Sequence, residues 1–405
     1  MTTQTNPPST TVPQREVRRR PKNRRAQIAA ESAAAFAANG YHGVSMDDIA
    51  KRLGISSTAL YRHFPNKYAL FREELLRLSG LIAGTTALAE ADGSPRERID
   101  QLLDAVIAMT IANRATVRLT RWERRYLEPD DYHQLIEELT GPIRLMRALV
   151  AQVRPELSGH DRAVRAVAIF ALTSSIGDHH VKVSSEVLAP LLHSASWAII
   201  DADLTTPESA TPEISETSSD APLFRQEQLL RAAVTLFHER GYPNVSMEDI
   251  AGAANLVAAS AVYRYYRGKS DLLATAFRRA AERASAAITA ATSTERPPEA
   301  ALAELIDGYV RDCFAERALT FVYYTEFGNV DAADQVTLRQ MQQAVVTEWA
   351  ALVVKARPEL TMSEARVLVH ACFSLVVDLG WIFRDTGICK RGKVIRILEA
   401  VAYRP

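Results

Sequence analysis

The sequence repeats itself, and this internal repeat restricts the possible fold more than any other feature. The segment 40–50, GYHGVSMDDIA, returns at 241–251 as GYPNVSMEDIA, and the RPEL of 154–157 returns at 357–360. Equivalent residues are 201 positions apart up to Ala251 and 202 apart at Tyr263. A repeat this long indicates that a whole domain has been duplicated, so the 405 residues must fold as two related halves.

The stretch 45–67, SMDDIAKRLGISSTALYRHFPNK, predicts two short helices joined by a tight turn. Ser45 and Asp48 have the spacing of a capping box that starts the first helix, and Gly54 supplies the turn. Ser56 is placed to cap the second helix, whose outer face carries side chains suited to a major groove. We predict DNA contacts from Ser45, Ser56, Ser57, Thr58, Tyr61, His63 and Lys67.

At these residues the chain resembles the tetracycline-repressor (TetR) family. The shared pattern reads here Ser45, Ile49-Ala50, Gly54-Ile55-Ser56, Leu60-Tyr61, Phe64 and Lys67. The resemblance implies a small N-terminal DNA reader, followed by a larger helical effector domain that dimerises through its last two helices. The alternative is a helical hairpin that belongs to some other all-α protein.

Helical periodicity continues beyond the reader. Apolar residues recur at three- and four-residue spacing over 95–112, 114–127, 130–153, 161–182 and 187–200. Strand-like alternation is scarce. We therefore expect an all-α fold of two tandem repeats, each a three-helix helix-turn-helix unit followed by a larger helical bundle.

A basic segment precedes the first expected helix at 24–39. Residues 15–25 hold seven basic residues and one acidic residue, and 15–77 hold thirteen basic against six acidic. We expect this arm to contact phosphates or a minor groove, which favours a polyanionic partner. The alternative is a solvated basic tail. The predicted contacts are Arg18, Arg19, Arg20, Lys22, Arg24 and Arg25.

Residues 201–222 separate the two copies with six acidic residues, no basic ones and repeated Thr, Ser and Pro, which predicts a solvated linker. The expected domains are a disordered basic arm at 1–23, a first helix-turn-helix at 24–67, a first effector-binding and dimerisation domain at 68–200, the acidic linker at 201–222, a second helix-turn-helix at 223–269 and a second effector-binding and dimerisation domain at 270–405.

The second helix-turn-helix diverges at its turn. GISST at 54–58 is answered by NLVAAS at 255–260, which is one residue longer and loses the glycine and most polar side chains. No basic arm precedes it, and 222–279 hold eight basic against five acidic residues. We expect weaker DNA binding, through Tyr263, Arg264, Tyr265 and Lys269. The alternative is a helix-turn-helix with a purely structural role.

One duplicated chain can form the dimer of the resembled family internally. The expected pairing helices are 161–182 with 187–200 in the first copy and 363–385 with 390–402 in the second. About twenty flexible linker residues reach roughly 25 Å, which is comparable to a domain diameter. We therefore expect an intramolecular pseudo-dimer, with further homo-oligomerisation open.

The effector helices are rich in aromatic residues, and more so in the second copy. They predict a pocket for a small, mostly apolar effector, with the equivalent residues Glu123 and Glu326 as polar handles. The alternative is that the aromatic residues are ordinary core. The candidate lining residues are Met109, Trp122, Glu123, Tyr126, Tyr309, Phe314, Tyr323, Tyr324, Glu326, Phe327 and Trp349.

The sequence gives little support for disulfides, metal sites, membrane segments or enzymatic motifs. The three cysteines are odd in number and lack metal-type spacing, so reduced thiols in the cytoplasm are expected. The adjacent His179 and His180 point in different directions on a helix, which argues against a metal site. No signal peptide, membrane span, nucleophile elbow, HExxH or phosphate-binding loop is found in the sequence. We predict no enzymatic activity, cofactor or membrane contact.

Two functions remain open. The favoured one is a transcriptional repressor in which effector binding changes the spacing of the readers and lowers their affinity for double-stranded operator DNA. The other is a ligand-independent architectural or protein-interaction module that keeps a vestigial reader. Sequence-selective, strongly salt-dependent binding would favour the first.

Overall fold

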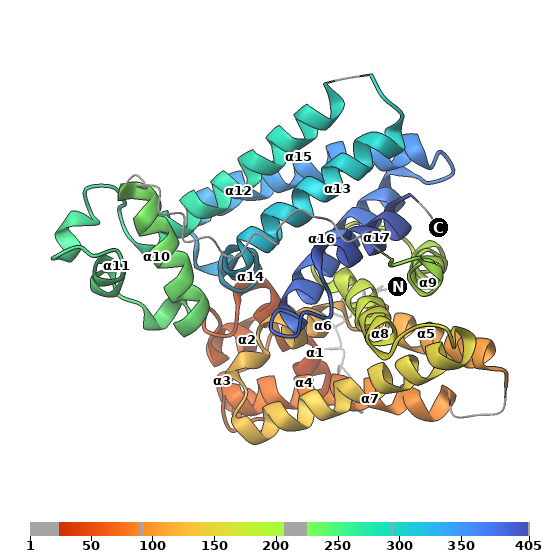
Figure 1. Cartoon of the computed structure of the whole chain (residues 1–405). Helices are drawn as coiled ribbons and strands as arrows, with labels where there is room; N and C mark the ends of the chain where they lie inside the picture. The colour runs from red at the N-terminus through yellow and green to blue at the C-terminus, as the bar shows by residue number, and fades with distance from the viewer. Residues whose placement is uncertain (1–23, 90–92, 206–224, 294, 404–405) are drawn as a thin grey trace, which may run out of the picture.

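Every regular element in the computed structural model is a helix within the described residues, which are 24–89, 93–205, 225–293 and 295–403. This confirms the all-α prediction. Most of the basic arm, most of the acidic linker and the last two residues lie outside the described residues. Figure 1 shows the second copy above the first, with α10 and α11 at the left of the view and α2 and α3 also toward the left.

The first copy comprises α1 (Arg24–Asn39), α2 (Met46–Arg52), α3 (Ser57–Tyr61), α4 (Lys67–Ala89), α5 (Pro95–Ala112), α6 (Arg114–Trp122), η1 (Arg124–Tyr126), α7 (Pro129–Val153), α8 (Gly159–Ser174), η2 (Ser175–Gly177) and α9 (Ser185–Asp201). The second comprises α10 (Arg225–Arg240), η3 (Tyr242–Asn244), α11 (Met247–Ala253), η4 (Ala259–Ala261), α12 (Lys269–Thr292), α13 (Pro298–Ala315), α14 (Arg317–Glu326), η5 (Phe327–Asn329), α15 (Ala332–Ala356), α16 (Met362–Ile382) and α17 (Arg391–Ala402). The η elements are single 3₁₀ turns.

Local sequence sets where these helices begin. Ser45 and Ser94 form capping boxes at the start of α2 and α5, as their spacing predicts. Ser246 and Thr361 do the same for α11 and α16. The start points also align the copies, because α4 and α12 both begin at the lysine of the repeat and α5 and α13 both begin at a proline.

The two copies share one apolar core along the seam predicted for dimerisation. α8 packs against α16 and α9 against α17. The core cluster joins Val164 and Leu172 of the first copy to Val367 and Leu368 of the second, and all four side chains are buried. Lys393 Nζ also lies 2.7 Å from Asp161 Oδ1 across the seam.

α16 is the central element of this seam. It is long and apolar enough to cross a membrane by length and composition, but most of it is buried among other helices. It packs against α8 of the first copy and against α15 and α17 of its own copy. Burial on several sides explains why its sequence is apolar almost all round.

We expect Leu368→Ala to lower the free energy of unfolding by about 2–5 kcal/mol, because it leaves a cavity in a core that both copies share. Hydrogen exchange should therefore rise in α8 as well as in α16. The matched control is Leu229→Ala, in a separate core cluster of the second copy, which should loosen the second reader and leave α8 protected. Unchanged exchange in α8 of the Leu368 variant would contradict a shared core.

Candidate nucleic-acid interface and effector pocket

The first reader is built from α2, a tight turn and α3. Gly54 takes a φ of 64° in the turn, a conformation that glycine adopts without strain. Ser45 and Ser56 use their hydroxyls as helix caps and accept from the backbone N–H groups of Asp48 and Ala59. These two serines therefore fix the reader geometry, and the prediction that they also touch DNA is not tested.

The outer face of α3 holds the first reader's free side chains. Thr58 is exposed and the Tyr61 side chain is 51% exposed, so both can meet a groove. His63 is half-buried, and Ser57 donates a hydrogen bond to the Asp47 carboxylate. Arg62, which the sequence analysis did not select, is exposed beside Tyr61 and adds a charged donor suited to a phosphate.

Arg25, a predicted DNA contact, holds the first reader together. Arg25 donates to the Glu73 carboxylate at 2.8 Å and to the His63 carbonyl at 2.7 Å, and it lies over the Phe64 ring. These contacts tie α1 to α4 and to the end of α3. Arg24 donates to Gln27 on its own helix. The remaining predicted arm contacts, Arg18, Arg19, Arg20 and Lys22, lie outside the described residues.

Lys67 and its counterpart Lys269 make the same contact in both copies. Lys67 Nζ donates to the carbonyls of Tyr41 and Val44, at 3.0 and 3.1 Å, and lies 4.4 Å from the centre of the Tyr41 ring. Lys269 Nζ donates to the Tyr242 carbonyl at 2.7 Å and lies 4.3 Å from that ring. Burial lowers the pKa of both lysines. Their observed role is to hold the loop after the first reader helix.

The second reader keeps the turn and loses the helix that follows it. Asn255 adopts a φ of 55° where the first copy has Gly54, a conformation that asparagine tolerates better than most residues. The inserted residue is Val257, whose side chain is fully exposed. Ala258 then occupies the capping position of Ser56 and offers no side-chain acceptor. A single 3₁₀ turn forms in place of α3.

Exposed side chains still follow that turn. Tyr263 and Tyr265 are 55% and 42% exposed, and Arg264 is exposed between them. They extend from a shorter and uncapped support than the equivalent residues of the first reader. The structure thus gives a physical reason to expect weaker binding by the second reader.

Glu123 and Glu326, predicted as effector handles, join the effector helices to the readers. Glu123 accepts from the N–H of Tyr41 at 3.2 Å, and Glu326 accepts from the N–H of Tyr242 at 3.4 Å. Burial raises the pKa of both carboxyls. Arg125 of the first copy also donates to Glu326 at 2.8 Å, so this joint crosses between the copies.

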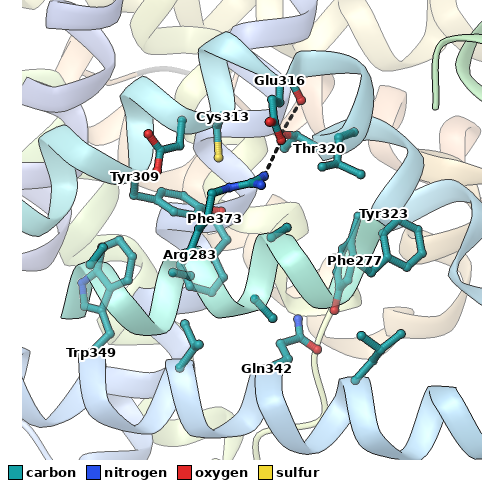
Figure 2. Close-up of a pocket in the computed structure, with 18 of the residues that line it drawn as sticks. Phe277, Arg283, Tyr309, Cys313, Glu316, Thr320, Tyr323, Gln342, Trp349 and Phe373 are labelled. Carbon is teal, nitrogen blue, oxygen red and sulfur yellow. Dashed lines mark hydrogen bonds and ion pairs between the residues drawn. The ribbon is translucent and has the colours of Figure 1, made fainter. Parts of the chain in front are cut away.

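The main cavity lies inside the second copy, between α12, α13, α14 and α15, with about 1050 Å³ of space including its open mouth. In Figure 2, Tyr309, Phe373 and Trp349 gather on one side and Phe277 and Tyr323 on the other. Most of the lining is apolar or aromatic. The polar lining groups are Arg283, Asp312, Cys313, Glu316, Thr320 and Gln342, with Arg283 and Glu316 paired.

The predicted effector residues fall into several groups. Tyr309, Tyr323, Tyr324 and Trp349 line the main cavity, and Phe314 lines a smaller one beside it. Trp122, Glu123, Tyr126 and Phe327 line a crevice between the two copies, which Tyr324 also lines. Met109 packs in the first copy and Glu326 has no exposed surface.

The α12 wall of the main cavity was missed by the sequence analysis. Ala280, Ala281, Ala284 and Ala287 line it, and their small side chains leave the space open. Alanines at helical spacing on a helix that faces the core were the available signal.

Two polar lining residues of the main cavity are neutral at pH 7. Burial raises the pKa of Cys313 to about 12 and that of Tyr309 well above its usual value.

No group of three or more His, Cys, Asp or Glu side chains suited to a metal ion is found in the part of the chain that the structure describes. His179 stacks on His370 of α16 with ring centres 4.6 Å apart. Burial lowers the pKa of both imidazoles, to about 4 for His370. This pair therefore belongs to the packed seam.

Two helix-turn-helix units, each supported by a helical bundle and one bundle holding a large apolar cavity, define a DNA-binding transcriptional regulator with two readers in one chain. Residues 28–73 and 229–276 match the sequence family described as bacterial regulatory proteins, tetR family. The DNA-binding domain of this family therefore occurs twice in the chain. That family and fold are those of transcriptional regulators rather than enzymes.

A curated relative is the HTH-type transcriptional activator FasR of Mycolicibacterium smegmatis, 32% identical over 83 residues. The match covers 20% of this chain and 38% of that protein, so the chain aligns with less than half of its relative. Similar solved structures include the ketosteroid regulator KstR2 of Mycobacterium tuberculosis, 22% identical over 45% of this chain and 94% of that one, with a TM-score of 0.39. PfmR of Thermus thermophilus is 22% identical over 42% of this chain and 96% of that one, with a TM-score of 0.37.

We expect Tyr61→Ala to weaken binding to a selected operator by about 1–3 kcal/mol, because it removes an exposed side chain from the capped reader helix. The matched change Tyr263→Ala should cost clearly less, since that tyrosine follows an uncapped 3₁₀ turn. Fluorescence anisotropy with operator DNA, selected from a random pool, measures both. Equal losses in the two variants would show that the readers contribute equally.

Proposed function

We propose that this protein is an effector-responsive transcriptional repressor whose two copies act as an intramolecular pseudo-dimer on operator DNA. The observation that carries the proposal is the shared core of α8 and α9 with α16 and α17, because it holds two readers in one folded unit. In a homodimer of the family, the same helices would come from two chains. The proposed domain boundaries are those expected from the sequence.

The two readers have unequal roles in this proposal. The first reader supplies most of the affinity through Thr58, Tyr61 and Arg62, with the basic arm at 15–25 adding phosphate contacts. The second reader adds weaker contacts through its exposed arginine and tyrosines. Its half-site is therefore read loosely, and the operator is an imperfect repeat.

The effector is a small, mostly apolar molecule that binds the main cavity of the second copy. Aromatic walls from Tyr309, Tyr323 and Trp349 favour flat or branched apolar groups, and the Arg283–Glu316 ion pair adds one polar edge. α12 begins at Lys269 beside the second reader and continues into the cavity wall. A ligand that moves α12 therefore changes the position of that reader.

Ligand binding in the cavity changes the affinity of the protein for DNA. The position of the operator relative to the promoter then decides whether transcription is repressed or activated. The curated relative is named an activator, and its match to this chain extends over 83 residues only. We favour repression released by the effector, acting in the cytoplasm. The competing function, a ligand-independent architectural module, would leave the aromatic cavity without a role.

We expect one chain to be the smallest species that binds DNA. Light scattering at low concentration should give a mass near 44.7 kDa for the free protein and one chain per operator in the complex. Footprinting should show one strongly and one weakly protected half-site, about one helical turn apart. A tight homodimer that protects a perfect inverted repeat through its two N-terminal readers would overturn the pseudo-dimer.

We expect apolar and aromatic compounds to raise the melting temperature of the protein and to release it from the operator. A thermal-shift panel of lipids, acyl thioesters, aromatic compounds and polar metabolites measures the first effect, because a ligand that binds the folded state stabilises it. Anisotropy on operator DNA measures the second. Stabilisation by strongly polar metabolites alone would refute the apolar effector.

A further inference from the structure

The space equivalent to the main cavity is packed in the first copy. Leu78 and Ile82 of α4 are buried there together with Val117 of α6, and Met109 and Leu139 pack against them. The equivalent α12 residues are Ala280 and Ala284, which line the open cavity. Met109 is likewise replaced by Asp312 and Leu139 by Gln342. Two aliphatic side chains on α4 thus fill space that two alanines leave free.

The mouth of that space is also closed in the first copy. Asn113 stands where the second copy has Glu316, and its side chain accepts from Arg77 of α4 at 2.7 Å. Thr116 on the next helix donates to Glu74 of α4 at 2.7 Å. These bonds tie α4 to the start of α6. In the second copy, Glu316 pairs with Arg283 instead, which is itself part of the cavity lining.

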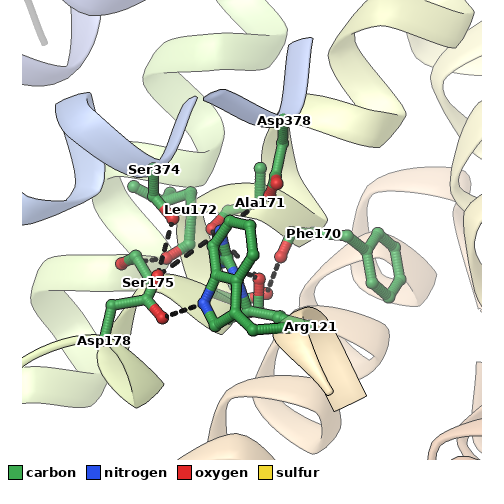
Figure 3. Close-up of polar contacts among 11 residues, drawn as sticks. Arg121, Phe170, Ala171, Leu172, Ser175, Asp178, Ser374 and Asp378 are labelled. Atoms are coloured by element: carbon green, nitrogen blue, oxygen red, sulfur yellow. Dashed lines mark hydrogen bonds and ion pairs between the residues drawn. The ribbon is translucent and has the colours of Figure 1, made fainter. Parts of the chain in front are cut away.

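One residue of the main cavity touches the first copy. The Tyr324 ring stacks on Trp122 of α6, with ring centres 4.7 Å apart and an angle of 18° between the planes. Trp122 Nε1 donates to Asp178 Oδ1 at 2.6 Å. Arg121 lies 3.4 Å from Asp178 and 3.0 Å from Asp378 of α16. Figure 3 shows Arg121 between these two carboxylates.

This contact between the copies has no counterpart under the pseudo-twofold symmetry. Helix start points pair Arg121 with Tyr324 and Trp122 with Thr325, so the second copy lacks both the tryptophan and the arginine of the network. The contact therefore connects the cavity of the second copy to the first copy. No equivalent contact starts from the first copy, where the corresponding space is filled by Leu78 and Ile82.

The last turn of α6 supports the first reader. Arg118 Nε donates to the Ala37 carbonyl near the end of α1 at 3.1 Å, and Glu123 holds the Tyr41 N–H in the loop that follows. α1 and α6 pack along each other. A displacement of Trp122, which ends α6, therefore changes the support of α1 and of the reader built on it.

We propose that the chain has a single effector site, in the second copy, and that Tyr324 and Trp122 transmit its occupancy to the first-copy reader. This rests on the proposed effector response. The site takes an amphipathic ligand with aromatic rings, because the aromatic walls stand beside the polar Arg283–Glu316 ion pair. One molecule bound in the second copy thus controls the first copy, which supplies most of the affinity for DNA in this proposal.

The number of sites is tested with 1-anilinonaphthalene-8-sulfonate as the probe, by isothermal titration. Wild type should bind one molecule per chain. The variant Ala280→Leu/Ala284→Ile, which installs the first-copy side chains, should lose at least about tenfold in probe affinity. Leu78→Ala/Ile82→Ala should add a second molecule per chain. Two sites in wild type, no saturable binding, or unchanged binding in the Ala280/Ala284 variant would overturn the single site.

The transmission is tested by the drop in operator affinity that the probe causes, which coupled sites typically place at about 5- to 150-fold. Trp122→Leu should keep probe affinity and reduce that drop to less than about twofold. The matched control is Trp197→Leu, a tryptophan whose indole donates to Asp100 away from the cavity and which should keep the full drop. A full drop in the Trp122 variant, or an equal loss in both variants, would overturn the transmission alone.

The proposed function has a separate readout in the same experiment. If the probe binds wild type at one site and leaves operator affinity unchanged, the effector response itself is refuted for this ligand class, and the transmission with it. Absence of sequence-selective binding to any DNA would refute the regulator proposal while leaving the titration result on the single site intact.

Discussion

The apolar seam between α8 and α9 of one copy and α16 and α17 of the other is the interaction on which the rest of the structure depends. Burial of α16 against helices of both copies joins them in one core, and it places the buried Arg121 between carboxylates of both. Breaking such a pair by removing one partner is expensive, because a charge is then left buried without a counter-charge. The position of each reader is therefore fixed relative to the other through protein contacts.

The two copies differ in their helix-turn-helix units and in their effector domains. The first copy keeps a capped reader helix after Ser56 and fills its effector domain with Leu78 and Ile82. The second copy replaces the cap with Ala258 and opens a cavity behind Ala280. In a homodimer each change would occur in both halves at once, and the loss would not be compensated. Such a difference between the two halves is possible because they belong to one chain.

Much of the fold was predictable because its signals are local. The capping boxes at Ser45 and Ser94 depend on residues three apart, and the helix pairs of the seam follow from the family resemblance together with the repeat. The partners of Lys67 and Glu123 were not predictable, since both side chains bind backbone groups that only tertiary folding brings near. Pocket residues were predicted in both copies, with more aromatic ones in the second copy, where the main cavity lies. Its α12 wall was missed, because alanine is common in helices and its presence alone does not indicate an adjacent cavity.

The lengthened turn around Val257, with only a 3₁₀ turn after it, makes the two halves of the chain unequal. A homodimer looks the same after half a rotation about its axis, so it binds a site equally well in either direction. This chain has no such equivalence, because its two helix-turn-helix units differ in length, capping and charge. In the pseudo-dimer proposed above, the complex with DNA would have a direction, and inverting the operator would turn the half that holds the cavity toward the opposite side.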